Sequence, residues 1–117
     1  MRVGAGTVLN NGAAIIAERG CIDIGRNCLI GRNLSVVDSD FHGLSVVERR
    51  SGKHPVADVR IGDEVFIGND VTLLKGVSVG AGAVIGSGAI VVRDVEPNAI
   101  YAGNPARLIR YLDEPDQ

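Results

Sequence analysis

The sequence predicts an all-β domain in which short strands stack into a triangular parallel β-helix. An aliphatic residue recurs every six positions from Ile61 to Val91. Glycine follows that residue in most units but not in every third one. The chain has two Phe, two Tyr and no Trp among 45% hydrophobic residues, so small aliphatic side chains must fill the core. Repetitive stacking suits such a composition better than an irregular globule.

The six-residue unit predicts strands and not helices. From residue 61 the chain divides into IGDEVF, IGNDVT, LLKGVS, VGAGAV, IGSGAI and VVRDVE. Alternate residues of a strand share one face, whereas a helix of 3.6 residues per turn would scatter a six-residue repeat around its axis. The fifth position is also small and apolar throughout, at Val65, Val71, Val77, Ala83, Ala89 and Val95. Glycine at the second position predicts corners with unusual backbone angles.

Three units form one coil of 18 residues with three sides. The second position is glycine at residues 25, 31, 62, 68, 80 and 86, but the third unit of each group has Ile16, Val37, Leu74 or Val92 there. The same division fits the chain from Ile24 and, more loosely, from Val3, with a three-residue slip at a bulged corner near residues 18–20. About four coils are expected, with Val3, Ile24, Ile61 and Val79 in one ladder at about 4.8 Å spacing.

The repeat breaks after Phe41. If it continued, His42, Glu48 and His54 would point into the core, and burying such unpaired polar groups would cost several kcal/mol. An extruded loop is therefore expected at about 43–58, with the ladder resuming near Val59. Loops of this length inside compact domains are usually functional or disordered. His42 stands where the chain leaves a rigid support, which suits a catalytic group.

Charge and composition narrow the classes of function. The net charge is −2 and the twelve Lys and Arg form no block, which disfavours a nucleic-acid-binding surface. No apolar run approaches the roughly 20 residues of a membrane span, and no signal-peptide core is present, so a single cytoplasmic domain over residues 1–117 is expected. Cys21 and Cys28 match neither a zinc pattern nor a disulfide framework and are expected as reduced thiols.

Several motifs resemble the hexapeptide-repeat acyltransferases, which include galactoside, maltose and polysaccharide O-acetyltransferases. They are VVDSDFH at residues 36–42, the loop that follows, and the stretch from Ile61 to Arg110. The GNPAR turn, from Gly103 to Arg107, is one of the more specific marks. The resemblance covers residues 3–112. It implies a left-handed β-helix, a homotrimer, and coenzyme A bound in the groove between neighbouring subunits.

The resemblance also implies that His42 is the general base. An imidazole with a reference pKa of about 6.5 can accept a hydroxyl proton at neutral pH. Asp40 projects to the same side of an extended chain and could orient the imidazole, or it could pair instead with Arg19 from the coil before. Asp38 is expected as a solvated charge at a corner.

No metal is expected. The γ-type carbonic anhydrases share the fold implied by the resemblance but need three zinc-binding histidines, and this chain has two. The second histidine, His54, is expected to be an ordinary loop residue.

The resemblance implies acetyl-CoA as co-substrate, contacted by Asn69, Ser87, Val92, Arg93, Arg107 and Arg110. The first two occupy corners that bond the pantetheine arm in the family. Arg93 stands where relatives often have Lys beside the phosphates of the cofactor, and either cation supplies the charge.

A short C-terminal helix is expected at about 105–113. Asn104 suits an N-cap and Pro105 suits the first helical position. Arg107 and Arg110 would share one side of this helix. A solvated face is the alternative interpretation of these two arginines.

The acceptor site is less defined. Phe66 could line an acceptor pocket beside His42 or pack between subunits, and Glu48 could contact the acceptor or the histidine. The leading hypothesis is acetyl-CoA-dependent O-acetylation of a sugar hydroxyl at a site between subunits. N-acetylation of an amino sugar and a non-catalytic trimeric scaffold are the alternatives. His42, Arg93 and Arg107 disfavour the scaffold, because a scaffold requires none of them.

Overall fold

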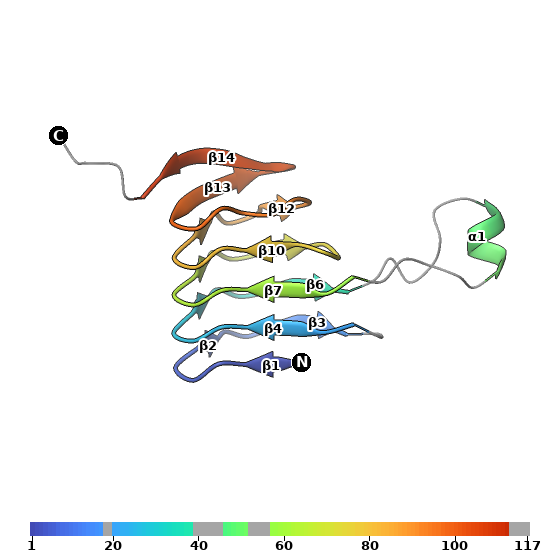
Figure 1. Ribbon diagram of the computed structural model, residues 1–117, viewed down its shortest axis with the longest axis horizontal. Coiled ribbons are helices and arrows are strands. Elements are labelled where there is room, and N and C mark those ends of the chain that lie inside the picture. Colours follow the sequence, from blue (N-terminus) through green and yellow to red (C-terminus); the bar gives the residue numbers. More distant parts are fainter. Residues whose placement is uncertain (18–19, 39–45, 52–56, 113–117) are drawn as a thin grey trace.

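The computed structural model describes residues 1–17, 20–38, 46–51 and 57–112 of the chain. Short strands wind around one axis, which is vertical in Figure 1, and stack as coils with three walls. The only helix in the described ranges, α1 (Val46–Ser51), has six residues, and none there is long and apolar enough to cross a bilayer. The expected all-β stack of parallel strands is confirmed.

Each wall is a sheet, named here A, B or C. Sheet A contains β1 (Arg2–Val3), β4 (Ile22–Ile24), β7 (Val59–Ile61) and β10 (Ser78–Val79). Sheet C contains β3 (Ala14–Ile16), β6 (Ser35–Val37), β9 (Thr72–Leu73) and β12 (Ile90–Val91). Sheet B contains β2 (Val8–Leu9), β5 (Leu29–Ile30), β8 (Phe66–Ile67), β11 (Val84–Ile85), β13 (Ala99–Gly103) and β14 (Ala106–Tyr111).

The strand register matches the six-residue division. Val3 pairs with Ile24, Ile24 with Ile61, and Ile61 with Val79, all in parallel. The expected ladder is therefore confirmed, with Ile24 following Val3 by 21 residues instead of 18. The bulged corner expected near residues 18–20 falls largely outside the described residues. The ladder resumes at Val59, which is buried and pairs with Ile22.

The predicted inward positions form the core. From residue 61 onward every first-position and fifth-position side chain is at most 3% exposed: Ile61, Val65, Ile67, Val71, Leu73, Val77, Val79, Ala83, Ile85, Ala89, Val91 and Val95. Burial of each large aliphatic side chain stabilises the fold by about 1.5–3 kcal/mol. Together these aliphatic side chains fill a narrow interior in a chain that has only two Phe, two Tyr and no Trp.

The role expected for the second-position glycines is wrong. None of the six has a positive φ. Apart from Asn98 and Gly103 near the C-terminal hairpin, the left-handed angles occur at the fourth position of the units, at Gly6, Gly12, Asn27, Asn33, Glu64, Asp70, Gly76, Gly82 and Gly88. A Cβ on Gly25 would lie 2.6 Å from the carbonyl carbon of Gly62 in the next coil. The second position therefore needs glycine because neighbouring coils approach each other closely there, and not because of its backbone angles.

The expected helix at about 105–113 is also wrong. Residues 106–111 form β14, which pairs antiparallel with β13, and Asn104 and Pro105 lie in the turn between them. β13 would otherwise present an open row of backbone N–H and C=O groups, which β14 satisfies. A helix this short gains little stability of its own, so strand pairing prevails over the local helical pattern.

Gly25→Ala should destabilise the fold by about 3 kcal/mol or more, because the new methyl overlaps backbone of the adjacent coil. Gly88→Ala is the matched control, since its φ is +78° but no atom lies within 4 Å of the added Cβ. Only the strain of the left-handed angle, about 1–2 kcal/mol, is expected there. Urea unfolding of both variants measures the difference, and equal losses would contradict the role assigned to Gly25.

Candidate functional site

Two predicted cofactor residues stack on the corner between sheets B and C. The backbone N–H of Arg32 donates to Asn69 Oδ1 at 2.8 Å, and the N–H of Asn69 donates to Ser87 Oγ at 3.0 Å. These bonds join three successive coils. The amide Nδ2 of Asn69 and the hydroxyl proton of Ser87 remain as donors for a ligand. A ligand that fits this corner therefore carries acceptors such as amide carbonyl groups.

A cavity of about 360 Å³, the side pocket, lies along this corner. Its lining residues are Asn10, Leu29, Ile30, Gly31, Phe66, Ile67, Gly68, Asn69 and Ser87. The pocket brings Phe66, which is 52% exposed, together with the polar corner. Leu29 lies beside Phe66 on the neighbouring strand and continues its apolar wall. One wall of the side pocket is thus apolar and the other presents hydrogen-bond donors.

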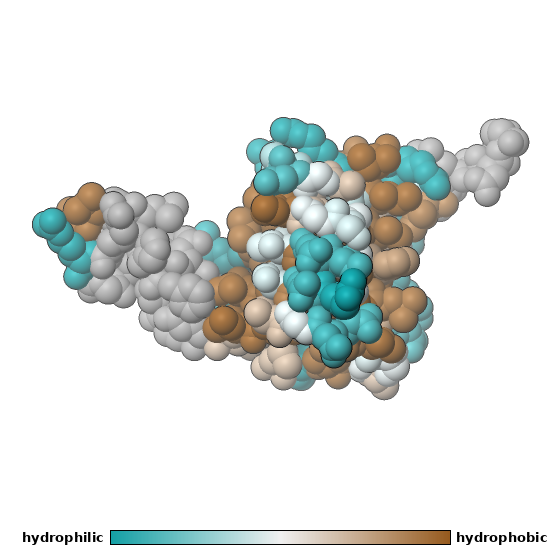
Figure 2. Space-filling model, turned by 180° about the vertical axis from the view of Figure 1, so that it is seen from behind, coloured by the Kyte–Doolittle hydropathy of each residue, from teal (hydrophilic) through white to brown (hydrophobic). Residues whose placement is uncertain are grey.

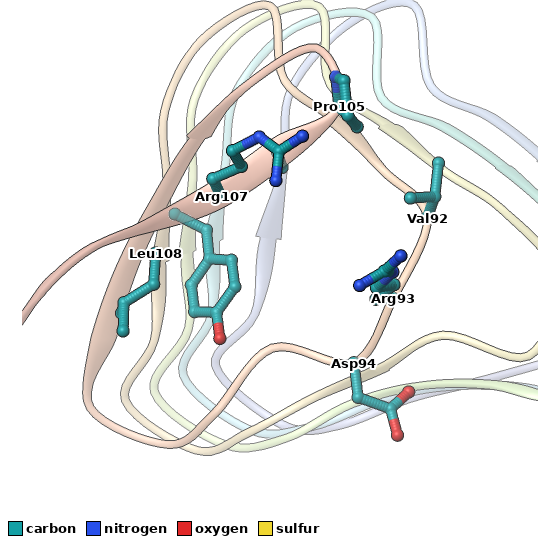
Figure 3. A pocket seen from close by; sticks show the side chains of 8 residues that line it. Val92, Arg93, Asp94, Pro105, Arg107 and Leu108 are labelled. Atoms are coloured by element: carbon teal, nitrogen blue, oxygen red, sulfur yellow. The ribbon is translucent and has the colours of Figure 1, made fainter.

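A second cavity of about 280 Å³, the end pocket, lies at the C-terminal end of the stack (Figure 3). Its lining residues are Val92, Arg93, Asp94, Tyr101, Pro105, Ala106, Arg107 and Leu108. The fold therefore brings together three of the predicted cofactor residues, Val92 and Arg93 after β12 and Arg107 on β14.

The end pocket suits an anion. Figure 3 shows Arg93 and Arg107 bordering the pocket, while Asp94 points away from both. The Asp94 carboxylate instead accepts the backbone N–H of Ser78 at 2.9 Å. Within the described part of the chain, neither arginine forms an ion pair. Two guanidinium groups with no carboxylate facing them are well placed for a phosphate.

The remaining predicted site residues are not brought into these pockets. Arg110 does not line the end pocket, and its Nη1 donates to the carbonyl oxygen of Tyr111 at 3.3 Å. Glu48 lies on α1, away from the coils (Figure 1). His42 and Asp40 fall outside the described residues, as does His54.

Asp38 is buried, and its expected role as a solvated corner charge is wrong. Its side chain is 0% exposed, and Oδ2 accepts the backbone N–H of Gly20 at 2.6 Å. Its own N–H donates to Ile16 O at 3.2 Å, and its carbonyl accepts the N–H of Ala57 at 2.8 Å. Asp38 thus joins the end of the first coil to both ends of the inserted segment. The repeat alone carried no signal for this, because the contact depends on where the segment returns.

No cluster of three His, Cys, Asp or Glu side chains is placed to hold a metal ion among the residues that the structure describes. Cys21 is exposed and Cys28 is buried, and both are free thiols.

Two hexapeptide-repeat family profiles match the chain. The profile described as bacterial transferase hexapeptide (six repeats) matches residues 58–93, and the one described as hexapeptide repeat of succinyl-transferase matches residues 21–46. Among curated proteins, the polysialic acid O-acetyltransferase of Neisseria meningitidis is 33% identical over 66 residues, which cover 56% of this chain and 31% of that protein. The chain spans about a third of the length of the curated relatives that it matches.

Solved structures share the fold. A hexapeptide-repeat-containing acetyltransferase from Vibrio cholerae superposes with a TM-score of 0.84 at 29% identity, covering 96% of this chain and 62% of that one. The same Vibrio protein has been solved in complex with acetyl coenzyme A. A maltose O-acetyltransferase from Clostridium difficile 630 gives a TM-score of 0.74 at 27% identity, covering 97% of this chain and 67% of that one.

Asp38→Ala should lower the free energy of unfolding by about 1–3 kcal/mol, because it removes a buried carboxylate and leaves the half-buried N–H of Gly20 without its acceptor. Asp58→Ala is the matched control: Asp58 also accepts a backbone N–H, that of Cys21 at 2.8 Å, but is exposed to water. A clearly smaller loss is expected for the control in urea unfolding. A larger loss of unfolding free energy for Asp58→Ala than for Asp38→Ala would contradict the role of Asp38 as the main link between the first coil and the inserted segment.

Proposed function

Because the chain belongs to the hexapeptide-repeat transferase family, we propose that it transfers the acetyl group of acetyl-CoA to a hydroxyl of a sugar or sugar-containing acceptor. The observation that carries the proposal is the end pocket, whose lining includes Arg93 and Arg107 together with Val92. The complex of the Vibrio relative with acetyl coenzyme A supports the co-substrate. The polysialic acid and maltose O-acetyltransferases support hydroxyl transfer to a carbohydrate.

The two pockets match the two chemical parts of coenzyme A. Its phosphates fit the end pocket, where Arg93 and Arg107 offer charge-assisted hydrogen bonds, with Arg110 nearby on the same strand as Arg107. Its pantetheine arm carries amide carbonyls, which are the acceptors that the donors of Asn69 and Ser87 require. No metal ion is needed for this assignment.

His42 supplies the base in this proposal. Its imidazole removes the hydroxyl proton as the acceptor oxygen attacks the thioester carbonyl. When the tetrahedral intermediate collapses, the C–S bond breaks, the imidazolium returns the proton to the sulfur, and coenzyme A leaves as a thiol. Asp40 orients the imidazole by accepting a hydrogen bond from its second nitrogen.

Phe66 and Glu48 are the proposed acceptor contacts. The exposed ring of Phe66 and the adjacent Leu29 provide an apolar wall for one face of a sugar ring. Glu48 contributes a carboxylate that can accept hydrogen bonds from sugar hydroxyls.

The proposal includes the assembly implied by the family. We take residues 1–117 as a single domain forming a left-handed β-helix of about four coils, which assembles as a homotrimer with the active site between subunits. The reaction is placed in the cytoplasm, because acetyl-CoA is a cytoplasmic metabolite.

His42→Ala should reduce acetyl transfer by at least about 10²-fold, the lower end for loss of a general base. The assay follows thiol release from acetyl-CoA with a panel of sugars, including amino sugars, which would reveal N-acetylation. His54→Ala is the matched control, because it removes the other histidine and should retain activity. Equal rates for wild type and His42→Ala would remove His42 from the mechanism.

Arg93→Ala and Arg107→Ala should each raise the KM for acetyl-CoA by about tenfold or more, as expected when a charged hydrogen bond is lost. The same variants should show a smaller rise in Tm on adding coenzyme A. Arg60→Ala is the control, because Arg60 is exposed on sheet A, outside both pockets. An unchanged KM in both pocket variants would refute the phosphate site.

A further inference from the structure

Asp38 is buried in a way that the repeat does not require. Among the residues that the structure describes, it is the only polar or charged side chain that is buried, with 0% of its surface exposed. The residues at the same place after the paired strands β9 and β12 are Lys75, which is half-buried, and Arg93, which is exposed. Burial of a carboxylate is costly unless the group is bonded. The burial of Asp38 therefore belongs to the coil that carries the inserted segment, and not to this corner in general.

The two ends of the inserted segment are bonded to each other and to the coils on either side. We call these end residues, Asp38 and Ala57, the neck. The Asp38 carbonyl accepts the N–H of Ala57 at 2.8 Å, and the Ala57 carbonyl accepts the N–H of Gly76 in the next coil at 3.3 Å. Toward the coil before, Asp38 donates its N–H to Ile16 O at 3.2 Å, and its Oδ2 accepts the N–H of Gly20 at 2.6 Å. The N–H, the carbonyl and the side chain of Asp38 are thus all fixed by hydrogen bonds.

The neck lies a short length of chain away from the proposed base. His42 follows Asp38 by four residues, and four residues of extended chain span at most about 14 Å. Further along the same segment, α1 stands away from the stacked coils, at the right of Figure 1 and at the left of Figure 2. The hydrogen bonds that the structure describes between this segment and the coils lie at its two ends. The position of His42 therefore depends on how firmly the chain is held at Asp38.

We propose that Asp38 is a positioning residue for the transfer reaction: it holds the start of the inserted segment so that the imidazole of His42 keeps one position relative to the coils. This inference rests on the proposed function, because it takes His42 as the base. A base must lie within hydrogen-bond reach of the proton that it removes, and a displacement of about 1 Å can lower the rate by about 10²-fold. A rotation of about 10° at Asp38, acting over up to about 14 Å, would displace His42 by up to about 2 Å.

Two substitutions separate this role from a general loss of stability. The bond to Gly20 requires an acceptor, and the amide oxygen of Asp38→Asn can accept the same N–H, whereas Asp38→Ala cannot. Asp63→Ala is the matched control, because Asp63 Oδ1 also accepts a backbone N–H from the coil before, that of Arg26 at 2.8 Å. Asp63 lies at the corner between sheets A and B and lines neither pocket.

The first test observes the imidazole directly and needs no acceptor. The chain has two histidines, so His54→Ala leaves His42 as the only imidazole. In protein labelled with 13C-histidine, the ring C–H signals of His42 should lie away from those of free histidine at the same pH. Asp38→Ala should move them to the free positions, while Asp38→Asn and Asp63→Ala should leave them unchanged. Signals that coincide with free histidine before substitution, or that Asp38→Ala does not move, would overturn the inference.

The second test separates kcat from KM, using the acceptor that the sugar panel identifies. Asp38→Ala should lower kcat by about tenfold to 10²-fold and leave the KM for acetyl-CoA within about twofold, because the residues assigned to coenzyme A lie on other coils. Asp38→Asn should retain kcat within about threefold, and Asp63→Ala should match wild type. A loss of kcat as large in either of these two variants as in Asp38→Ala would contradict the positioning role. Asp38→Ser, whose hydroxyl is too short to reach the N–H of Gly20, replaces Asp38→Ala should that variant not fold by circular dichroism.

Failure of this inference and failure of the proposed function give different results. If His42→Ala transfers acetyl groups at the wild-type rate, the assignment of the base is wrong and Asp38 has no base to position. If His42→Ala is inactive while Asp38→Ala folds and keeps the wild-type kcat, the base stands and the positioning role of Asp38 is wrong.

Discussion

The close approach of neighbouring coils at the corners is the constraint on which the structure depends. At the second position of most units there is no room for a Cβ: one added to Gly80 would lie 2.4 Å from the nitrogen of Pro97. At the same corners, Asp63, Asn69 and Ser87 accept backbone N–H groups from the coil beside them. Because these bonds repeat in register from coil to coil, the prism is regular at its edges as well as along its walls.

This regularity sets the relative positions of the site residues. Asn69 and Ser87 stand one coil apart because their corner repeats, and the same bonds that join the coils leave their donors facing the side pocket. The end pocket arises differently, because it forms where the stack stops and β13 and β14 fold back as a hairpin. Arg93 comes from the last regular corner and Arg107 from the hairpin. The cation pair therefore exists only at the terminal coil.

The sequence predicted the interior better than the surface, for a physical reason. Burial follows the six-residue period, which is local, so Leu73 and Ile85 could be assigned to the core without knowledge of the rest of the chain. The C-terminal strand depends on pairing with the open edge of β13, and this pairing prevails over the helical spacing of Arg107 and Arg110.

Asp38 was misassigned because equivalent positions, such as Arg93, are exposed where the chain simply continues. Its burial comes from the returning segment at Ala57. The pocket residues were found through family resemblance, since no periodicity distinguishes Asn69 or Ser87 from other corner residues.

The coil residues assigned to coenzyme A and the inserted segment are held in the fold by different contacts. The surfaces assigned to coenzyme A sit on coils bonded above and below at every corner, so a change at Asn69 disturbs the stack as well as the ligand contact. The inserted segment, to which the sequence assigns the base and an acceptor contact, is tied to the coils through Asp38, Ala57 and Asp58. Substitutions between those anchors leave the coil bonds untouched. Of the two proposed acceptor contacts, Glu48 on α1 can therefore change without a change in the coils, whereas Phe66 on β8 lines the same pocket as Asn69 and Ser87.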